Sequence, residues 1–459
     1  MRQLGSSSPF PKDFLWGAAA AAYQIEGASA EGGRGDSVWD VFCREPERVW
    51  RGHSGANACD HYHRYRDDVA LMSELELQAY RLSIAWPRVL PHGTKQVNEA
   101  GLDFYDRLVD ELLRAGISPY ITLYHWDMPA ELYFRGGFLN RDSSNWFAEF
   151  AALMARRLGD RVSNWFTLNE PQVFIGAGLE RGIHAPGLKL NYPEVLRAGH
   201  HCMMAHGRAV QAIRANSKLT ARVGYAPVGI PKIPHTAQAA DVDAARTRMF
   251  DVPTKNCWNN SWWMDPVLLG HYPETGLSAY GNDMPQFPDH DLDIICQPLD
   301  YLGVNIYQGQ RTLAGKDGPE ELPQPVGAPI TAFDWPVSPE ALYWGPRFLH
   351  ERYGLPMVIT ENGLSCRDWI STDGKVHDPN RIDFTKRYLR ELGRAIAEDI
   401  PVFGYFHWSI LDNFEWCEGY KHRFGLVFVD YETQRRIPKD SALWYRNVIR
   451  SNGNELYID

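Results

Sequence analysis

Residues 79–124 read AYRLSIAWPRVLPHGTKQVNEAGLDFYDRLVDELLRAGISPYITLY, and this stretch contains one full repeat of the pattern that decides the fold. Segments 79–85 and 118–124 are short aliphatic and aromatic runs, which are typical of buried strands. Segment 101–115 lies between them and carries apolar residues at helical spacing. Two strands connected through a helix predict a parallel pair joined by a crossover.

The same alternation of strand and helix continues along all 459 residues. The other strands are predicted at 14–20, 163–168, 222–227, 301–306, 356–360 and 402–408. The other helical patterns occupy 60–76, 143–158, 193–214, 339–353 and 381–397. Eight strand–helix units close into a barrel, for which about 250 residues are enough.

The sequence therefore predicts an α/β fold, a (β/α)8 TIM barrel, with its extra residues in long βα loops. These loops are expected at 170–192, 228–300 and 308–338. No linker rich in Ser, Gly or Pro divides the chain, so residues 1–459 are expected to form a single catalytic barrel domain. The rival fold is an open doubly wound sheet that binds a nucleotide, and it requires a glycine-rich phosphate loop after an early strand. The first predicted strand is followed by AAAYQIEG, which has no such pattern.

Composition and charge exclude several classes of protein. A formal net charge of −10 argues against a nucleic-acid-binding protein, which needs a basic face. No apolar run approaches the length of a membrane span, and segment 14–23 is better explained as a buried strand than as an export signal. The seven cysteines are scattered without a CxxC pair, which indicates reduced thiols and a cytoplasmic protein.

Polar and aromatic residues gather where the predicted strands end. In a parallel barrel these carboxyl ends meet at one face, where active sites are built. The polar ends are Gln24 and Glu26 after the first strand, Arg81 and Ser83 in the second, His125-Trp126-Asp127 after the third, Asn169-Glu170-Pro171 after the fourth, Asn305 and Tyr307 after the sixth, Thr360-Glu361-Asn362-Gly363 at the seventh, and His407-Trp408 with Asn413-Phe414-Glu415-Trp416 at the eighth. Stability alone does not account for so many polar ends on one face.

Two glutamates in this set, Glu170 and Glu361, suit the cleavage of a glycosidic bond. That reaction needs one carboxylic acid to protonate the leaving oxygen and one carboxylate to attack the anomeric carbon or to activate water. Like charges held close together do not ionise together easily, so one of the two is expected to keep its proton near neutral pH. Taken singly, each glutamate is equally consistent with an ion pair to Arg81 or with a helix cap.

The ordered set of motifs resembles glycoside hydrolase family 1, the β-glucosidase family, from about Phe10 to Tyr445. The matching segments are YQIEG at 23–27, YRLSIAWPR at 80–88, HWD at 125–127, TLNEP at 167–171, ITENG at 359–363, HWS at 407–409 with the run through Trp416, and RFGLV at 423–427. A single N-E-P tripeptide is a weak signal, whereas this ordered set along the whole chain is highly specific.

The resemblance implies the eight-stranded barrel and a retaining mechanism. It assigns Glu170 to the position of the acid/base and Glu361 to that of the nucleophile, which forms a covalent glycosyl-enzyme. It implies that Asn169 holds the sugar 2-hydroxyl, that Arg81 lies beneath Glu361 and keeps it ionised, and that Tyr307 donates a hydrogen bond to the same carboxylate.

The remaining site residues also follow from the resemblance. Gln24, His125, Trp126 and Glu415 match the hydroxyl-binding set, with Asn305 at the same strand ends. Glu415 is expected to grip the 4- and 6-hydroxyls beside Trp416, while Trp408 forms the floor under the sugar and Phe424 helps to close the wall. Trp335 matches a tryptophan on the outer, leaving-group side.

The expected activity is that of an exo-acting β-glucosidase on a small-molecule β-glycoside, with no cofactor and no metal. The expected partners include neither nucleic acid nor a membrane, and the sequence carries no signal for the oligomeric state. Glu415 would repel a 6-phosphate, which disfavours the phospho-glycosidases of the family. Glu170 stands where myrosinases carry glutamine, which disfavours an enzyme specific for thioglucosides. A β-galactosidase or β-fucosidase of the same mechanism, transglycosylation, and a catalytically inactive sugar-binding protein remain alternatives.

Overall fold

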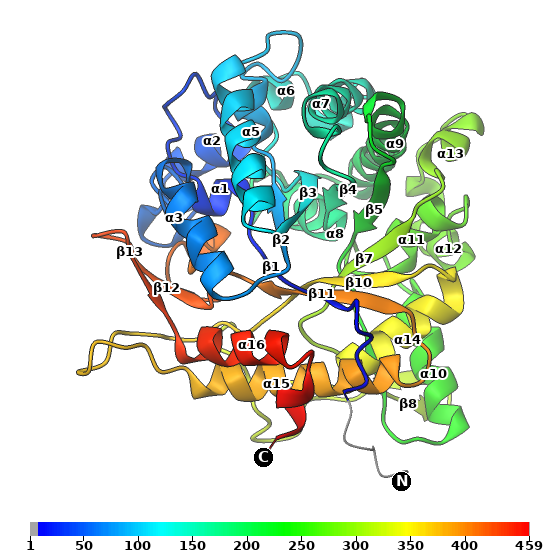
Figure 1. Cartoon of the computed structure of the whole chain (residues 1–459). Helices are drawn as coiled ribbons and strands as arrows, with labels where there is room; N and C mark the ends of the chain where they lie inside the picture. The colour runs from blue at the N-terminus through cyan, green and yellow to red at the C-terminus, as the bar shows by residue number, and fades with distance from the viewer. Residues whose placement is uncertain (1–7, 459) are drawn as a thin grey trace.

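The computed structural model describes residues 8–458 and shows a closed barrel of eight parallel strands surrounded by helices (Figure 1). The barrel strands are β1 (Leu15–Ala19), β2 (Ala79–Ser83), β3 (Ser118–Tyr124), β4 (Asn164–Asn169), β5 (Arg222–Ala226), β7 (Tyr301–Asn305), β10 (Met357–Asn362) and β11 (Val402–Trp408). Each strand pairs with its sequence neighbour in the barrel, and β1 closes the ring by pairing with β11. The predicted TIM barrel is confirmed.

The eight barrel strands coincide with the eight predicted segments, with ends that differ by no more than two residues. Strands in a parallel barrel are covered on both faces, so their sequences are apolar nearly throughout, and β2 and β10 are buried at every position. The prediction ended the seventh strand at 360, but β10 continues to Asn362 and therefore contains Glu361. Glu361 belongs to the strand even though, as a polar residue, it ends the apolar run by which a strand is recognised in the sequence.

Helices connect the strands and cover the outside of the barrel (Figure 1). Those after the first four strands are α1 (Ala22–Ile25), α2 (Val38–Arg44), α3 (His61–Glu74), α4 (Trp86–Val89), α5 (Glu99–Arg114), α6 (Ala130–Phe134), α7 (Ser143–Leu158), α8 (Pro171–Ile175) and α9 (Tyr192–Asn216). The later ones are α10 (Ala239–Phe250), α11 (Ser261–Leu268), α12 (Glu274–Tyr280), α13 (His290–Ile295), α14 (Ala341–Tyr353), α15 (Pro379–Ile396) and α16 (Asp440–Arg450). Short 3₁₀ turns lie at η1 (Trp50–Gly52), η2 (Gly137–Leu139), η4 (Gly281–Asp283), η5 (Trp416–Glu418) and η6 (Asn454–Tyr457), and a π-turn lies at η3 (Gly176–Glu180).

The insertions predicted as long loops contain secondary structure of their own. Segment 228–300 contains α10 to α13, and 170–192 contains α8 and the π-turn. Strands β6 (Lys232–Pro234), β8 (Gln310–Gly315) and β9 (Gly318–Glu321) form a small separate sheet, and β12 (Val427–Asp430) pairs with β13 (Arg435–Pro438). Helix α11 is buried at seven of its eight residues and contains Pro266, so its sequence lacks the one-sided apolar periodicity by which surface helices are recognised.

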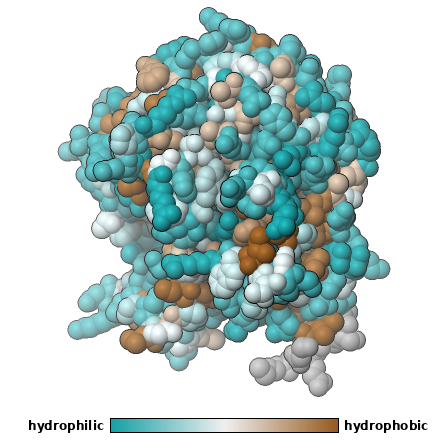
Figure 2. Space-filling view, turned by 90° about the vertical axis from the view of Figure 1, so that its left-hand side faces the viewer, coloured by the Kyte–Doolittle hydropathy of each residue, from teal (hydrophilic) through white to brown (hydrophobic). Residues whose placement is uncertain are grey.

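Hydrophilic residues predominate on the face shown in Figure 2, and apolar residues appear there in small separate groups. Among residues 8–458, no helix combines the length and the apolar character that a bilayer span requires. All seven cysteines are free thiols.

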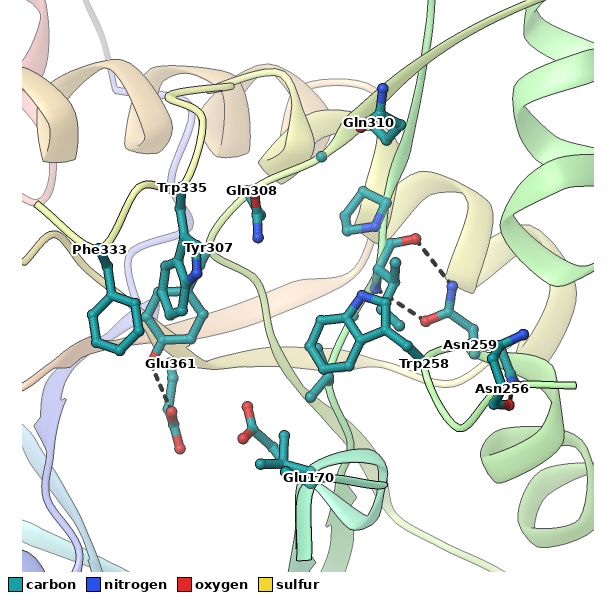
Figure 3. A pocket seen from close by; sticks show the side chains of 18 of the residues that line it. Glu170, Asn256, Trp258, Asn259, Tyr307, Gln308, Gln310, Phe333, Trp335 and Glu361 are labelled. Atoms are coloured by element: carbon teal, nitrogen blue, oxygen red, sulfur yellow. Dashed lines mark hydrogen bonds between the residues drawn. The ribbon is translucent and has the colours of Figure 1, made fainter. Parts of the chain in front are cut away.

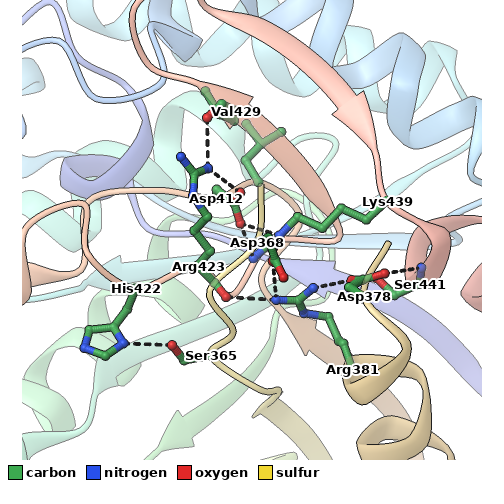
Figure 4. Close-up of polar contacts among 12 residues, drawn as sticks. Ser365, Asp368, Asp378, Arg381, Asp412, His422, Arg423, Val429, Lys439 and Ser441 are labelled. Carbon is green, nitrogen blue, oxygen red and sulfur yellow. Dashed lines mark hydrogen bonds and ion pairs between the residues drawn. The ribbon is translucent and has the colours of Figure 1, made fainter. Parts of the chain in front are cut away.

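A buried network of charges ties the segment after β10 to the segment after β11 (Figure 4). Lys439 Nζ lies 2.6 Å from Asp368 Oδ2 and 2.7 Å from Asp412 Oδ1. Asp412 Oδ2 also accepts from Arg423 Nη1 at 2.6 Å, and its Oδ1 accepts from the Gly425 amide at 2.9 Å. Asp412 and Gly425 flank the turn that carries Glu415, Trp416 and Phe424, so the network fixes the base of that turn.

Replacing Lys439 with methionine is expected to lower the free energy of unfolding by about 3–5 kcal/mol, because it leaves the buried carboxylates of Asp368 and Asp412 without their shared cation. Denaturant unfolding of the full chain measures this loss. Arg387→Met is the control, because it removes only an exposed pair with Asp383 and is expected to change little. Equal stabilities of the two variants would contradict the proposed importance of the buried network.

Candidate active site

A cavity of about 950 Å³ opens at the carboxyl ends of the barrel strands. Its lining includes Glu170 and Glu361, together with His125, Trp126, Tyr307, Trp335, Trp408, Glu415, Trp416 and Phe424. Figure 3 shows both glutamates at one end of this pocket, with Tyr307 directed at Glu361. The other predicted site residues, Gln24, Arg81, Asn169 and Asn305, are almost completely buried at the same strand ends.

Glu361 is held by two donors, Arg81 from β2 across the barrel and Tyr307 from the segment just after β7. Arg81 Nη1 lies 2.6 Å from Glu361 Oε1, and the Tyr307 hydroxyl donates to Glu361 Oε2 at 2.7 Å. Both carboxylate oxygens are thus bound by charged or strongly polar donors, which fixes the orientation of the group. The next residue but one, Gly363, packs so closely on β11 that a Cβ there would lie 1.9 Å from the Trp408 carbonyl oxygen. This close approach explains the glycine in the T-E-N-G motif.

Glu170 caps the carboxyl end of β4 in a left-handed backbone conformation, with φ 49° and ψ 66°. A residue other than glycine pays a steric cost of about 1–2 kcal/mol in this region, and such strain gathers at functional sites. Pro171 follows at the first position of α8, where its fixed φ suits the start of a helix. The Glu170 side chain accepts a hydrogen bond through Oε1 from Asn305 Nδ2 at 2.8 Å.

A chain of hydrogen bonds connects the two glutamates. Arg81 donates to Glu361 and, through Nη2, to Asn169 Oδ1 at 2.6 Å. Asn305 Nδ2 donates to the same Asn169 oxygen at 3.1 Å as well as to Glu170. Thr360, beside Glu361, donates to Asn305 Oδ1 at 2.6 Å. The positions of the two carboxyl groups are therefore set by one buried network.

Burial, mutual repulsion and the neighbouring donors act differently on the pKa values of the two glutamates. Loss of solvent and the charge of Glu361 raise the pKa of Glu170 to about 8, against the smaller opposing effect of Asn305. Burial also raises the pKa of Glu361, but the charge of Arg81 and the hydrogen bond from Tyr307 oppose that rise. Of the two glutamates only Glu361 has a cation in direct contact, so the proton is favoured on Glu170 and the charge on Glu361.

Two buried acceptor atoms beside the glutamates have no hydrogen-bond partner within the described part of the chain. They are Gln24 Oε1 and Glu415 Oε2. Gln24 is oriented by its amide nitrogen, which donates to the Phe414 carbonyl at 2.8 Å. Burial and the charge of Glu361 raise the pKa of Glu415 to about 8. Buried acceptors are seldom left unsatisfied, so this pair points to a ligand that brings several hydroxyl donors.

Aromatic rings line the same pocket as Glu415. The rings of His125 and Trp408 lie 5.7 Å apart and nearly parallel, and Trp126 and Trp416 lie 4.6 Å apart. The Trp126 indole donates to the Asn169 carbonyl at 2.9 Å, so its polar atom is already engaged. Burial, with a smaller contribution from Arg81, lowers the pKa of His125 well below its usual value and keeps the ring neutral. Flat apolar walls around hydroxyl-binding groups match the two kinds of surface on a sugar ring.

The outer wall contains a second aromatic group. Trp335 lies 5.2 Å from the Tyr307 ring and 4.7 Å from the Phe333 ring, and Phe424 lies 6.2 Å away. The sequence singled out Trp335, Tyr307 and Phe424 but missed Phe333. It also missed Thr122, which accepts from Arg81 Nε at 3.1 Å, because one threonine in an apolar strand gives no signal of its own.

Histidines in α3 and α9, at 61, 63, 200, 201 and 206, could suggest a metal site, but His61 and His200 contact neighbouring side chains instead. His61 Nδ1 lies 2.7 Å from Asp68 Oδ2, and His200 lies 2.9 Å from the Tyr272 hydroxyl. In the range 8–458 there is no group of three or more His, Cys, Asp or Glu residues that could hold a metal ion.

The barrel, the two buried carboxyl groups at its mouth and the unpartnered acceptors beside aromatic walls are together the features of a glycosidase. The sequence profile described as Glycosyl hydrolase family 1 matches residues 6–454. Beta-glucosidase A of Thermotoga maritima is 42% identical, over 97% of this chain and 99% of its own length. Thermostable beta-glucosidase B of Thermobispora bispora is 46% identical, over 97% of this chain and 91% of its own length.

A solved structure agrees with these relatives. The beta-glucosidase from Thermotoga maritima in complex with glucoimidazole superimposes with a TM-score of 0.89 at 42% identity, covering 97% of this chain and 99% of that one. The chain belongs to glycosyl hydrolase family 1.

Proposed function

We propose that this glycosidase is a retaining, exo-acting β-glucosidase that removes terminal, non-reducing β-D-glucosyl residues. The observation that carries the proposal is the hydrogen-bonded chain from Glu361 through Arg81, Asn169 and Asn305 to Glu170. This hydrogen-bond network favours the proton on Glu170 and the charge on Glu361 at the end of one pocket, as a double-displacement reaction requires. The names of the two relatives support glucose as the preferred sugar.

In the proposed reaction Glu361 attacks the anomeric carbon while Glu170 gives its proton to the leaving oxygen. The bond to the leaving group breaks and a bond from the sugar to the Glu361 carboxylate forms. Glu170 then removes a proton from water, and the water oxygen displaces Glu361 from the sugar. Two inversions return the sugar with its original β configuration.

The other site residues bind the sugar in this proposal. Asn169 holds the 2-hydroxyl, and Glu415 and Gln24 accept from hydroxyls on the far side of the ring through the oxygens that lack a partner. Trp408 supports the ring from below, with His125, Trp126 and Trp416 beside it, and Phe424 closes the wall. Trp335 contacts the leaving group.

A panel of glycosides tests the proposal. Purified protein is expected to release nitrophenol from the aryl β-glucoside faster than from the aryl β-galactoside and β-fucoside, and NMR of the first product is expected to show β-glucose. Release from no aryl β-glycoside would overturn the enzyme assignment, and α-glucose as the first product would overturn retention.

Replacing Tyr307 with phenylalanine is expected to shift the acidic limb of the pH profile of kcat/KM to higher pH. The Tyr307 hydroxyl lowers the pKa of Glu361, and Glu361 must be ionised to attack. Without that hydrogen bond the pKa of Glu361 rises. Glu361 is then protonated at a higher pH, so the variant loses activity at a higher pH than the wild-type protein when the pH is lowered. We expect kcat/KM at neutral pH to fall about 10- to 100-fold, equivalent to one strong hydrogen bond to a charge. An unmoved acidic limb would show that Tyr307 does not act on this carboxylate.

A further inference from the structure

The turn that carries Glu170 is not one that its backbone favours. Glu170 is in the left-handed region, with φ 49° and ψ 66°, between the end of β4 and the start of α8. A residue other than glycine keeps such a conformation only where the surrounding structure holds it. Pro171, the next residue, has no N–H with which to bind a neighbouring strand. The contacts that α8 makes are therefore part of what holds Glu170 in place.

The side chain of Gln172, in α8, binds the backbone of Val228 with both ends of its amide. Gln172 Nε2 donates to the Val228 carbonyl at 3.1 Å, and Gln172 Oε1 accepts from the Val228 N–H at 3.2 Å. Two hydrogen bonds in opposite directions fix both the distance and the orientation of the amide. Gln172 is only 1% exposed, and it lies behind the described lining of the cavity rather than in it. It can therefore affect the reaction only through the residues that it holds.

Val228 leads back to the carboxyl group of Glu170. It forms a parallel bridge with Asn305, so the segment after β5 stays attached to the end of β7. The Asn305 carbonyl also accepts from the Gly229 N–H at 2.8 Å. Asn305 Nδ2 in turn donates to Glu170 Oε1 at 2.8 Å. The path from Glu170 through Gln172, Val228 and Asn305 thus closes a ring on the Glu170 side chain.

The same segment also binds the backbone of Glu170. The Glu170 N–H donates to the Ala226 carbonyl at 2.9 Å. Residues 226–228 therefore hold the backbone of Glu170 directly and its side chain through Asn305, while Gln172 fixes α8 to them. Loss of the Gln172 amide would release α8 from this segment and would leave both polar backbone groups of Val228 without these partners.

We infer that Gln172 is a positioning residue for proton transfer, because its amide fixes α8 to Val228 and so keeps the Glu170 carboxyl group in place to protonate the leaving oxygen. This inference rests on the proposed function, in which Glu170 is the acid/base. A small displacement of a catalytic group is costly, because proton transfer requires hydrogen-bond distance to the reacting oxygen.

A role in stability alone would give a different result from a role in positioning. A glutamine that only satisfies the buried Val228 backbone would affect all substrates alike. A glutamine that positions Glu170 affects the steps in which Glu170 transfers a proton. The leaving oxygen of a glucose disaccharide needs a proton, whereas dinitrophenolate leaves without one.

The test compares Gln172→Met with the wild-type protein on a glucose disaccharide and on dinitrophenyl β-glucoside. Methionine has nearly the length of glutamine but makes neither hydrogen bond to Val228. We expect kcat/KM for the disaccharide to fall about 10- to 50-fold, mainly through kcat, and kcat/KM for dinitrophenyl β-glucoside to change less than about threefold. Added azide, which attacks the intermediate without a base, should raise kcat on dinitrophenyl β-glucoside more in the variant than in the wild-type protein.

Two further variants complete the comparison. Gln434→Met is the matched control, because the Gln434 amide also donates to two backbone carbonyls, those of Ala58 and Tyr431, each at 3.2 Å, but lies outside the cavity lining. We expect it to affect the two substrates equally. Gln172→Glu keeps an acceptor for the Val228 N–H, so its selective loss on the disaccharide should be smaller than that of Gln172→Met. It takes the place of Gln172→Met in the test if that variant does not fold.

An equal loss on both substrates in the Gln172 variants, or no loss on either, would overturn the inference and leave Gln172 a role in stability alone. An azide effect no larger than that of the wild-type protein would count against it in the same way. If the wild-type protein cleaves both glucosides, these results count against Gln172 and leave the proposed function standing. If the wild-type protein cleaves neither, the proposed function fails and the inference fails with it.

Discussion

Replacing Glu361 with alanine is expected to lower kcat for aryl β-glucosides about 10⁵-fold, because the variant has no group that can form the covalent glycosyl-enzyme. The substitution also removes the charge that Arg81 and Tyr307 are arranged to hold. Stopped assays with nitrophenyl glucoside measure the loss, and thermal unfolding shows whether the variant remains folded.

The anomer formed with added azide separates loss of the nucleophile from general damage. In Glu361→Ala, azide enters the space left by the carboxylate and attacks the substrate directly, so a single inversion should give α-glucosyl azide. Glu418→Ala is the matched control, since Glu418 is another pocket-lining glutamate but pairs with Lys421 at the surface, and it should retain most of the activity. A β-azide from Glu361→Ala, or full activity in that variant, would refute the assignment of the nucleophile.

The barrel and the inner site could be predicted because their physical requirements leave local traces in the sequence. Parallel strands buried on both faces give apolar runs, and each run ends at the polar residues that reach the barrel mouth. Glu170 and Glu361 were singled out as two carboxyl groups at the ends of such runs, and the family resemblance gave each of them a role. The contacts of Arg81 and Tyr307 with Glu361 were expected from the family resemblance, and the structure brings these side chains together.

The contacts that hold α8 in place could not be predicted in the same way. Gln172 and Val228 are 56 residues apart in the sequence, and Val228 lies beyond the end of β5, in a connection whose path depends on tertiary contacts. No period or motif connects the glutamine with the backbone that it binds. The buried charges around Lys439 are similarly hidden, because charged residues far apart in the sequence give no sign that they will share one site.

The protonation of Glu170 depends on the charge of its partner. Burial and the charge on Glu361 both raise the pKa of Glu170, which favours its protonated form before the first step of the proposed reaction. In the proposed reaction the charge of Glu361 disappears when Glu361 bonds to the sugar, and we expect the pKa of Glu170 to fall because the repulsion has gone. The same carboxyl group is then proposed to be the base that activates water. The donating form of Glu170 is present below its pKa and is lost as pH rises through about 8, so we expect this residue to set the alkaline limb of kcat/KM.

Replacing Glu170 with glutamine is therefore expected to have an effect that depends on the leaving group. Hydrolysis of a glucose disaccharide, whose leaving oxygen needs a proton, should slow about 10²- to 10⁴-fold, whereas release of dinitrophenol in the first step should change much less. The alkaline limb governed by Glu170 should disappear from the pH profile. Azide should restore turnover and give β-glucosyl azide, because Glu361 still forms the intermediate and azide attacks it without a base. Equal losses for both leaving groups, or an α-azide, would contradict the acid/base assignment. A β-azide from Glu170→Gln and an α-azide from Glu361→Ala would together assign the acid/base role to Glu170 and the nucleophile role to Glu361.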